Sequence, residues 1–496
     1  MKKNVIYLFM LAALVFSCEE DFLDPVRDSS VLLDAEIAEN VPFNPGLIEA
    51  SLDGIGVFMI DDRTITGTRH HDFGQKGIDI FMDIVCGDAA LSGSAFGWYN
   101  DVANMITTTD FTTEENEFIW SYYYRVINTA NTVIVTSGGE NPSTTDETTL
   151  RINAQAKAYR AYSYFYLAQL FQPAYDPNQE ILPFNTVDEV NPAKIPASVI
   201  YDQILSDLNF ALNNLGSYVR PSITQIDQSV INGLLAYTHA AMGNWADART
   251  HAEAVITSGY PLATAGALAF PGAGSGFNDV AAPNWIWGFD LTAEIGQQLI
   301  NWWGQMDFFT YSYAWAGDTK SIDNLLYSQI PADDIRSTQF GTGAAQLQPI
   351  NKFFDPGRTA GGQFVITTDY IFMRVEEFYL LSAEASARLG DEASAKNRLT
   401  DLLEIRFSGG TAAATSYLDD FTGPGLIDEI YFQTRVEMWG EGKSYFALKR
   451  NQATMTRGTN HVFRPNESFV HDSDEISFQI PEIEIINNPN ISSQNN

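Results

Sequence analysis

Cysteine, basic residues and long apolar runs are all scarce in this sequence. Its 496 residues include only two cysteines, Cys18 and Cys86, so a packed core rather than a disulfide framework must hold the fold. Lysine and arginine total 28 against 62 aspartates and glutamates, which gives a formal net charge of −34. Because such a surface repels phosphates, nucleic acid and anionic lipid are excluded as expected partners.

The only sustained apolar run near the N-terminus is too short to span a membrane. It extends over the twelve residues from Val5 to Phe16, whereas a spanning helix needs about 20. Lys2 and Lys3 precede it, and this order of charge and then apolar residues predicts a secretory signal peptide over residues 1–17. Cys18 follows directly and resembles the lipobox cysteine of bacterial lipoproteins, which is diacylated on sulfur. The alternative is an ordinary cleavage site beside a cysteine.

The segment from 18 to 35 is acidic, contains a proline and shows no sustained period. We interpret it as a lipidated tether between the membrane and the folded body. Loss of residues 1–17 removes two lysines and no acids, so the mature chain carries 26 basic and 62 acidic residues, a formal charge of −36. With Cys18 acylated, Cys86 has no cysteine with which to pair.

Catalytic motifs are missing. The Gly442-Lys443-Ser444 triplet is not a phosphate loop, because position 437 is glutamate where the loop needs glycine. No H-E-x-x-H or C-x-x-C occurs, and Ala273 replaces the first glycine of a G-x-S-x-G elbow. His70 and His71 are adjacent, and neighbours in a loop or strand usually point apart, so no metal site is expected. The sequence predicts a protein that is not an enzyme and needs no cofactor.

Two long segments have helical character, 118–135 and 150–171. In the second, small and apolar residues recur at steps of three and four, which predicts one packed helix face. That face is formed by Ala154, Ala158, Ala161, Phe165 and Ala168. Three tyrosines lie on the adjoining stripe, where we expect rings packed between helices with hydroxyls at the edge. They are Tyr159, Tyr162 and Tyr166.

An internal repeat indicates helical hairpins. Two segments share the pattern A-x-x-x-A-x-x-G, after which a second amphipathic helix begins. Small residues four apart let two helices approach closely, and glycine can adopt the left-handed conformation that ends a helix. The pattern is similar to half of a tetratricopeptide repeat. The residues are Ala236, Ala240 and Gly243 in the first copy, and Ala383, Ala387 and Gly390 in the second.

Between the hairpins, residues 262–366 lose helical periodicity and gain glycine, proline and aromatic residues. We expect Trp285 and Trp287 in the core of this region, because they flank an isoleucine in strand-like alternation. Sugar rings pack their C–H faces on aromatic side chains, often on loops. The expected ligand-binding residues are therefore Trp302, Trp303, Tyr311, Tyr313 and Trp315, with Trp98 and Tyr99 from a Gly/Ser-rich loop.

Several blocks in order resemble the SusD/RagB family of surface lipoproteins, over nearly the whole chain. They are "CEEDFLD" after the signal, "FIWSYYYRVINTANTVI", "AKAYRAYSYFYLAQLF" and "DYIFMRVEEFYLLSAEASARLG", then "TRVEMWGEGKSYFALKRN" and "FQIPEIEIINNPNISSQN". Lys443 and Ala447 depart from the family pattern. The residues that match it are Asp369, Arg374, Glu377, Tyr379, Ala383, Glu384, Arg435, Glu437, Glu441, Gly442, Phe446, Arg450, Ile480, Pro481, Glu484, Asn488, Pro489 and Gln494.

The resemblance implies a mainly α fold, with four tetratricopeptide-like helix pairs cradling an irregular loop-rich lobe and little β structure. It divides the body into a helical region at 36–261, the loop-rich excursion at 262–366 and a C-terminal helical region at 367–496. Matched charged residues are expected to form buried or interface ion pairs, since unpaired buried charges are costly. These are Arg374, Glu377, Arg435 and Glu441.

The function that the resemblance implies is binding. In the family, the lipoprotein covers a SusC-like TonB-dependent transporter at the surface of the outer membrane and captures a glycan or, in some members, a peptide. The ligand site is expected where the 300–315 loop approaches Trp98 and Tyr99, away from the helix pairs. A helical-repeat scaffold that binds protein alone, and a surface hydrolase with an unrecognised carboxylate pair, remain as alternatives.

Overall fold

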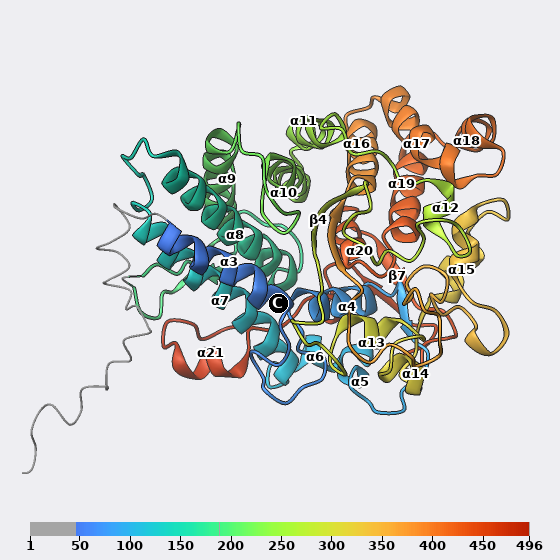
Figure 1. Cartoon of the computed structure of the whole chain (residues 1–496), viewed down its shortest axis with the longest axis horizontal. Helices are drawn as coiled ribbons and strands as arrows, with labels where there is room; N and C mark the ends of the chain where they lie inside the picture. The colour runs from blue at the N-terminus through green and yellow to red at the C-terminus, as the bar shows by residue number, and fades with distance from the viewer. Residues whose placement is uncertain (1–45, 188, 496) are drawn as a thin grey trace, which may run out of the picture.

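The computed structural model describes residues 46–187 and 189–495. Within these ranges the chain forms 19 α-helices and only short strands, which confirms the mainly α prediction (Figure 1). None of the described helices has both the length and the apolar character needed to cross a bilayer. The predicted signal peptide, Cys18 and the tether lie outside the described residues.

Long helices form the N-terminal part of the body. They are α3 (Gly46–Ile60), α7 (Glu114–Thr136), α8 (Glu147–Phe171) and α9 (Ala197–Asn214). Each packs against the next, α3 on α7, α7 on α8 and α8 on α9. Figure 1 shows this group in blue, teal and green on the left. The two helical segments expected from the sequence correspond to α7 and α8.

Helix α8 is buried on every side, which the sequence analysis did not anticipate. The predicted face is buried, but so are Tyr159, Tyr162 and Tyr166, and their hydroxyls lie in the interior rather than at an edge. A helix in the middle of a layered protein has no solvent face. Its buried cation Arg160 is accommodated because its Nε lies 2.8 Å from Asp207 Oδ2 and its Nη1 lies 2.6 Å from Glu140 Oε1.

The two predicted helical hairpins are confirmed. The first joins α10 (Gln228–Ala241) to α11 (Trp245–Ile256), and the second joins α16 (Glu376–Arg388) to α17 (Glu392–Arg406). Gly243 (φ 76°) and Gly390 (φ 78°) occupy the turns. A Cβ at either glycine would meet nothing within 4 Å, so the left-handed backbone, and not crowding, requires glycine here.

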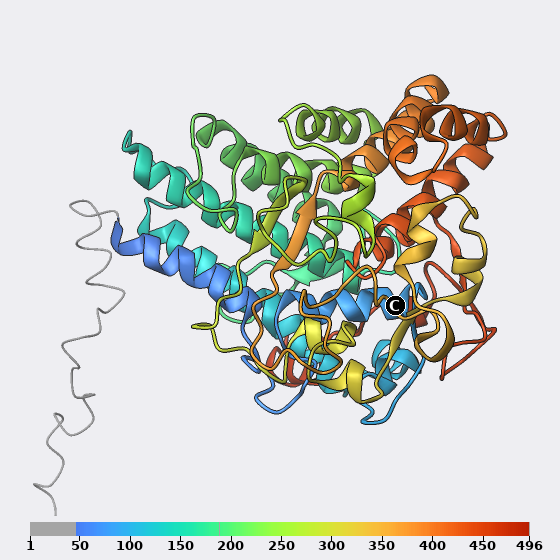
Figure 2. The same ribbon diagram turned by 45° about the vertical axis from the view of Figure 1, so that its right-hand side comes forward.

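The hairpins form one continuous row of helices although they lie far apart in sequence. Helix α11 packs against α16, and α17 packs against α18 (Gly410–Leu418). Figures 1 and 2 show this row crossing the top of the molecule. Below it, α19 (Pro424–Glu437) contacts α16 and α20 (Lys443–Arg450), and α20 contacts α4 (Gln75–Val85).

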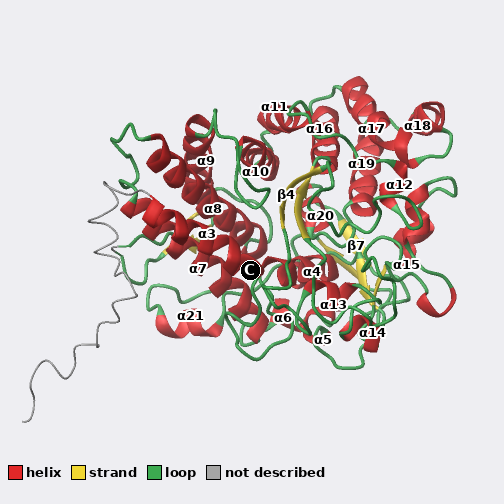
Figure 3. Cartoon of the chain, in the orientation of Figure 1, coloured by secondary structure: helices red, strands yellow, loops and turns green. Residues whose placement is uncertain are grey.

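The 262–366 region is irregular, as expected. Its elements are α12 (Ala265–Leu268), β4 (Trp285–Phe289), α13 (Trp302–Met306), α14 (Tyr313–Ala316), β5 (Lys320–Ile322), α15 (Asn324–Ser328), and the 3-10 helices η2 (Ile335–Gln339) and η3 (Gly343–Ala345). Loops dominate this part of Figure 3, at the lower right. Since short elements bury little backbone in ladders, side-chain packing must hold the region together.

The described strands form four antiparallel pairs, each of two strands. Strand β4 pairs with β6 (Tyr370–Arg374), and β1 (Ala89–Leu91) pairs with β5. The other pairs are β2 (Glu180–Pro183) with β3 (Lys194–Pro196), and β7 (Thr454–Thr456) with β8 (Ser468–Val470). The remaining short helices are α5 (Asn100–Ala103), α6 (Ile106–Thr109), η4 (Asp474–Ile476) and α21 (Glu482–Asn487).

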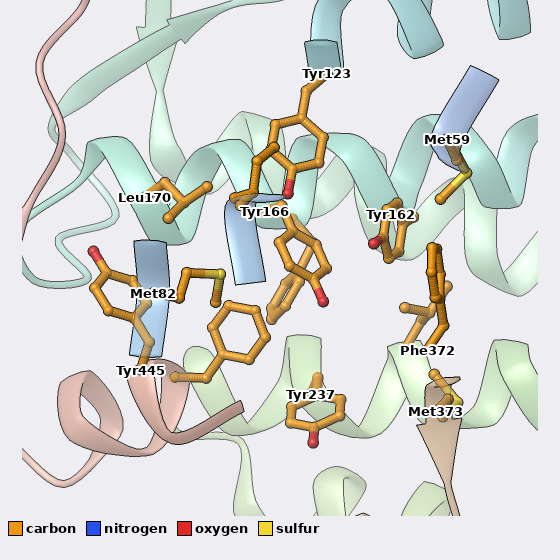
Figure 4. Packing of buried hydrophobic residues seen from close by; sticks show 14 of the residues in the cluster. Met59, Met82, Tyr123, Tyr162, Tyr166, Leu170, Tyr237, Phe372, Met373 and Tyr445 are labelled. Atoms are coloured by element: carbon orange, nitrogen blue, oxygen red, sulfur yellow. The ribbon is translucent and has the colours of Figure 1, made fainter. Parts of the chain in front are cut away.

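The core is rich in aromatic and methionine side chains (Figure 4). Trp285 and Trp287 belong to it, as predicted, with exposures of 2% and 1%. The Trp287 ring lies edge-on to Tyr162 of α8 and to Phe372 of β6, at centroid distances of 5.4 and 5.3 Å. Strand β4 is thereby fixed between the helical layer and the loop-rich region.

A cluster of buried charges lies where α17, α19, β6 and η2 meet. The Glu437 carboxylate lies 2.8 Å from Arg374, 2.6 Å from Arg406 and 3.1 Å from Arg336. Burial alone would raise the pKa of Glu437, but these guanidinium groups outweigh it and hold that pKa well below its ordinary value. Arg374 also contacts Glu441 at 2.8 Å.

Three of the four matched charged residues therefore form ion pairs, as predicted. Arg374 and Glu441 belong to the cluster, and Arg435 pairs with buried Asp88 at 2.7 Å. Glu377 differs, because it accepts hydrogen bonds from the Arg374 backbone N–H at 2.8 Å and from the Tyr237 hydroxyl at 2.7 Å. Its position at the start of α16 points its carboxylate at these donors rather than at a cation.

We predict that Glu437→Gln destabilises the fold by about 3–5 kcal/mol, because it leaves three buried guanidinium groups without their shared anion. Urea unfolding followed by circular dichroism measures the change. Glu467→Gln is the matched control, because it removes the charge from a more exposed pair in which Glu467 lies 2.8 Å from Arg464. Its effect should stay below about 1 kcal/mol. Equal losses of unfolding free energy in both variants would show that the buried cluster stabilises the fold no more than an exposed ion pair.

Candidate functional site

Two loops on the irregular side of the molecule are brought together by a small sheet. Residues 92–99 follow β1, and residues 307–319 precede β5, which pairs with β1 so that Leu91 lies opposite Lys320. The pairing continues past the strands, because the Ser92 N–H donates to the Thr319 carbonyl at 2.9 Å. The 300–315 segment and the Trp98 loop therefore meet, where the sequence analysis placed the ligand site.

The first aromatic group in this region comprises His70, Phe96, Trp98 and Tyr313, which we term the Trp98 cluster. His70 stacks on one face of Trp98, with ring centroids 4.5 Å apart and planes within 12°. Tyr313 lies edge-on to Trp98 at 6.1 Å and to Phe96 at 5.3 Å, and its hydroxyl contacts His70 Nδ1. Phe96 is 58% exposed, so the cluster reaches solvent.

The second group comprises Tyr311, Trp315 and Phe364, which we term the Trp315 cluster. All three are exposed, by 42%, 41% and 60% respectively. Tyr311 stacks on Phe364 with centroids 4.6 Å apart, and lies 5.4 Å from Trp315. Gly361, at φ 57°, supports the Trp315 ring, since a Cβ at that position would lie 2.7 Å from it. Exposed aromatic rings held this way form a preorganised apolar surface.

Four of the predicted ligand-binding residues are buried, which corrects their assignment. Tyr99 is 1% exposed, Trp302 2%, Trp303 0% and Tyr313 6%. Trp302 packs edge-on against Trp303 and Phe353, at centroid distances of 5.0 and 4.9 Å. A region with little regular structure needs large side chains to fill its interior, so the high density of tryptophan here partly serves packing. Trp98, Tyr311 and Trp315 remain as predicted ligand residues, whereas buried Tyr313 packs edge-on against Trp98.

Three members of the two clusters, Phe96, His70 and Phe364, were not among the predicted ligand residues. Phe96 shares the Gly/Ser-rich loop with Trp98, and that neighbourhood could have indicated it. The sequence offers His70 only as a metal ligand beside His71, whereas its ring stacks on Trp98. Phe364 had no local signal, because it reaches Tyr311 only through the contact between its own segment and the 308–311 segment, where the Tyr311 N–H donates to the Gln363 carbonyl at 2.9 Å.

A buried polar network fixes the backbone of the loop that carries Trp98. The Phe96 N–H donates to Asp318 Oδ1 at 2.7 Å, and Lys320 Nζ donates to Gln305 Oε1 at 2.7 Å. The Lys320 ammonium also lies 4.2 Å from the centre of the Tyr99 ring. Burial lowers the pKa of Lys320 to about 7. These contacts fix the loop backbone and leave the Trp98 ring partly exposed.

The site offers exposed aromatic contact surface. Among the described residues, no cluster of three or more histidine, cysteine or acidic side chains could hold a metal ion. Aromatic faces beside loop amides and hydroxyls suit a ligand that has both apolar faces and hydroxyl groups. In Figure 1, α14 lies at the lower right, away from the row of helices along the top, so the two clusters lie on the side predicted for the ligand.

Two family models match separate parts of the chain. The model described as the SusD family matches residues 308–496, and one described as "Starch-binding associating with outer membrane" matches residues 75–232. Both matches include residues of the aromatic clusters. No curated protein sequence matches the chain.

Solved structures share the fold over most of its length. A SusD-like carbohydrate binding protein from Bacteroides vulgatus is 23% identical, with a TM-score of 0.73, and the match covers 90% of this chain and 97% of that one. A SusD superfamily protein from Bacteroides fragilis is also 23% identical, with a TM-score of 0.71 and coverages of 90% and 99%. B. fragilis NanU is 14% identical, with a TM-score of 0.66 and coverages of 95% and 99%. These structures show the shared fold, and the two model matches show that the chain belongs to the SusD/RagB family.

Proposed function

We propose that this protein is a lipid-anchored nutrient-binding protein of the outer-membrane surface, which captures a glycan and delivers it to a SusC-like TonB-dependent transporter. The observation that carries the proposal is the pair of aromatic clusters on loops that a rigid helical body supports. The starch-binding description of one family model and the carbohydrate-binding title of one structural neighbour support a sugar as the ligand. In this proposal the protein binds its ligand and does not catalyse a reaction on it.

The geometry favours stacking of sugar rings in two places. His70 covers one face of Trp98, so a sugar would take the other face, and the exposed edge of Phe96 would border it. At the second place, Trp315, Tyr311 and Phe364 offer a larger exposed surface. Because α14 carries Tyr313 into one cluster and Trp315 into the other, one extended oligosaccharide could contact both.

A peptide is the second candidate ligand. Phe96 and Phe364 are the most exposed rings of the two clusters, and phenylalanine offers no hydroxyl to a sugar. Such rings equally suit apolar side chains of a peptide. A function as a scaffold that binds only other proteins would explain neither cluster, because a protein partner would contact the row of helices.

We predict that Trp98→Ala and Trp315→Ala each weaken glycan binding by about 1 kcal/mol, and that the double variant loses roughly tenfold or more. The melting temperature should change little, since both rings are partly exposed. A glycan and peptide array identifies the ligand, and isothermal titration calorimetry then measures its affinity.

Two further variants provide the controls for that experiment. Trp303→Ala should lower the melting temperature through the cavity that it leaves in the core. Trp245→Ala removes a partly buried tryptophan from α11, outside both clusters, and should leave binding unchanged. If the two cluster variants retain full affinity for every ligand found, the aromatic clusters are not the binding site.

We also predict that the native protein co-purifies with a large barrel transporter through one broad face of its helical part. Pull-down of tagged protein from detergent-solubilised outer membranes, followed by mass spectrometry, identifies the partner. The same tag on an unrelated outer-membrane lipoprotein is the control. Recovery of the protein alone would favour a free-standing binder.

The anchor is predicted to be the lipid on Cys18. Cys18→Ala should release the protein from the membrane fraction, because a twelve-residue apolar run cannot span the bilayer and the acidic surface does not adsorb to it. Metabolic labelling with a fatty-acid analogue reports the modification directly. Cys86→Ala is the matched control and should keep the label, because that thiol is buried. Equal labelling of Cys18→Ala and wild type would rule out this anchor.

A further inference from the structure

A cavity of about 400 Å³ lies in the loop-rich region and shares no residue with either aromatic cluster. One wall is formed by residues 261–267, which run into α12, and the other by residues 273–285, which run into β4. Small and apolar side chains line most of it, including Leu262, Ala267, Phe277 and Trp285. Its size and lining are those of sites that enclose a small molecule, about 300–1,000 Å³ in volume and mainly apolar.

The two walls are joined by one buried carboxylate. Glu376 accepts a hydrogen bond from the Ala263 N–H at 2.7 Å in the first wall, and from Asn284 Nδ2 at 3.1 Å in the second. Glu376 is itself held by Arg374 at 3.2 Å and by Arg406 at 3.7 Å. The cavity therefore rests on the buried charge cluster and is preformed, so a ligand would not have to order it.

Asn284 leaves an acceptor available in this cavity. Asn284 is one of the residues that line the cavity, and it is 4% exposed. The Glu376 carboxylate can only accept, so the Asn284 NH₂ group must face it and Oδ1 must point the other way. Among the described residues no donor reaches this oxygen. A ligand that donates to this oxygen would therefore form a hydrogen bond that the protein itself does not supply.

Charge selects against ionic ligands. The cations nearest the cavity floor, Arg374 and Arg406, are already paired with Glu376 and Glu437, so an anion would find no free partner. Asp279 is the one charged residue of the lining, and it is exposed and accepts the Ala281 N–H at 2.8 Å. A cation would lose its hydration in a mainly apolar space for a single carboxylate at the rim.

We propose that this cavity is a second binding site, which takes an uncharged molecule with an apolar ring face and a hydroxyl or amide N–H that donates to Asn284 Oδ1. The inference does not depend on the glycan site, because the two sites share no residue.

The matched probes are methyl 4-hydroxycinnamate and its methyl ether, methyl 4-methoxycinnamate, in which an O–CH₃ group replaces the O–H donor. Isothermal titration calorimetry and saturation-transfer NMR on the full chain measure their binding. We expect the phenol to bind and the ether to bind roughly three- to tenfold more weakly, as loss of one hydrogen bond implies. No binding of the phenol, or equal binding of the two probes, would overturn the proposal.

Variants then locate the site. Ala267→Phe and Ala273→Phe each place a ring in the cavity from its rim and should weaken phenol binding at least tenfold. Ala412→Phe adds the same ring to exposed α18 and should have no effect. Trp315→Ala should also leave phenol binding unchanged, which separates this site from the Trp315 cluster.

Thermal unfolding tests whether each variant is folded. If Ala267→Phe does not fold, phenol binding to Ala273→Phe decides whether the probe occupies the cavity. Retention of full phenol affinity in the folded rim variant would place the probe elsewhere and overturn the proposal.

Discussion

The pairing of Glu437 with three arginines is the interaction on which the rest of the structure depends. The partners come from separate elements, Arg336 from η2, Arg374 from β6 and Arg406 from α17. Burying these charges is favourable only if all of them are paired, so the elements that carry them must dock together. The cluster thereby fixes the loop-rich region to the row of helices, and the structure of that region follows from this attachment.

This attachment explains how an irregular region can support binding sites. Glu376, which joins the two walls of the cavity, belongs to the same charge network through Arg374 and Arg406. The aromatic clusters are held differently, by the β1–β5 ladder and by the contacts of Asp318 and Lys320 beneath the Trp98 loop. Loops that are fixed by a rigid body can present side chains in a defined geometry without regular structure of their own.

The two sites also differ in the ligand that they would suit. The clusters are open to solvent, and their exposed rings suit an extended ligand that lies across the surface. The cavity is lined mainly by small and apolar side chains and offers one acceptor, Asn284 Oδ1, so it suits a compact ligand. The loop-rich region therefore contributes both to an open aromatic surface and to a cavity.

Local signals in the sequence determined the helices, the two hairpins and the family. Helical periodicity and a glycine that can adopt positive φ act over a few residues, so they can be recognised without a structure. The matched blocks likewise indicated which charges would be buried, and only the hydrogen bonds of Glu377 differed from the expected ion pair.

Only the tertiary structure decided which aromatic rings face solvent. Trp302, Trp303 and Trp315 lie in one aromatic stretch and look alike in sequence, yet the first two are buried and the third is 41% exposed. The difference comes from partners distant in the chain, because Phe353 covers Trp302 and Gly361 supports Trp315 from one side. Helix α8 shows the same limit, since its neighbours bury all of its faces. Burial depends on which segments pack together, and a local pattern does not contain that information.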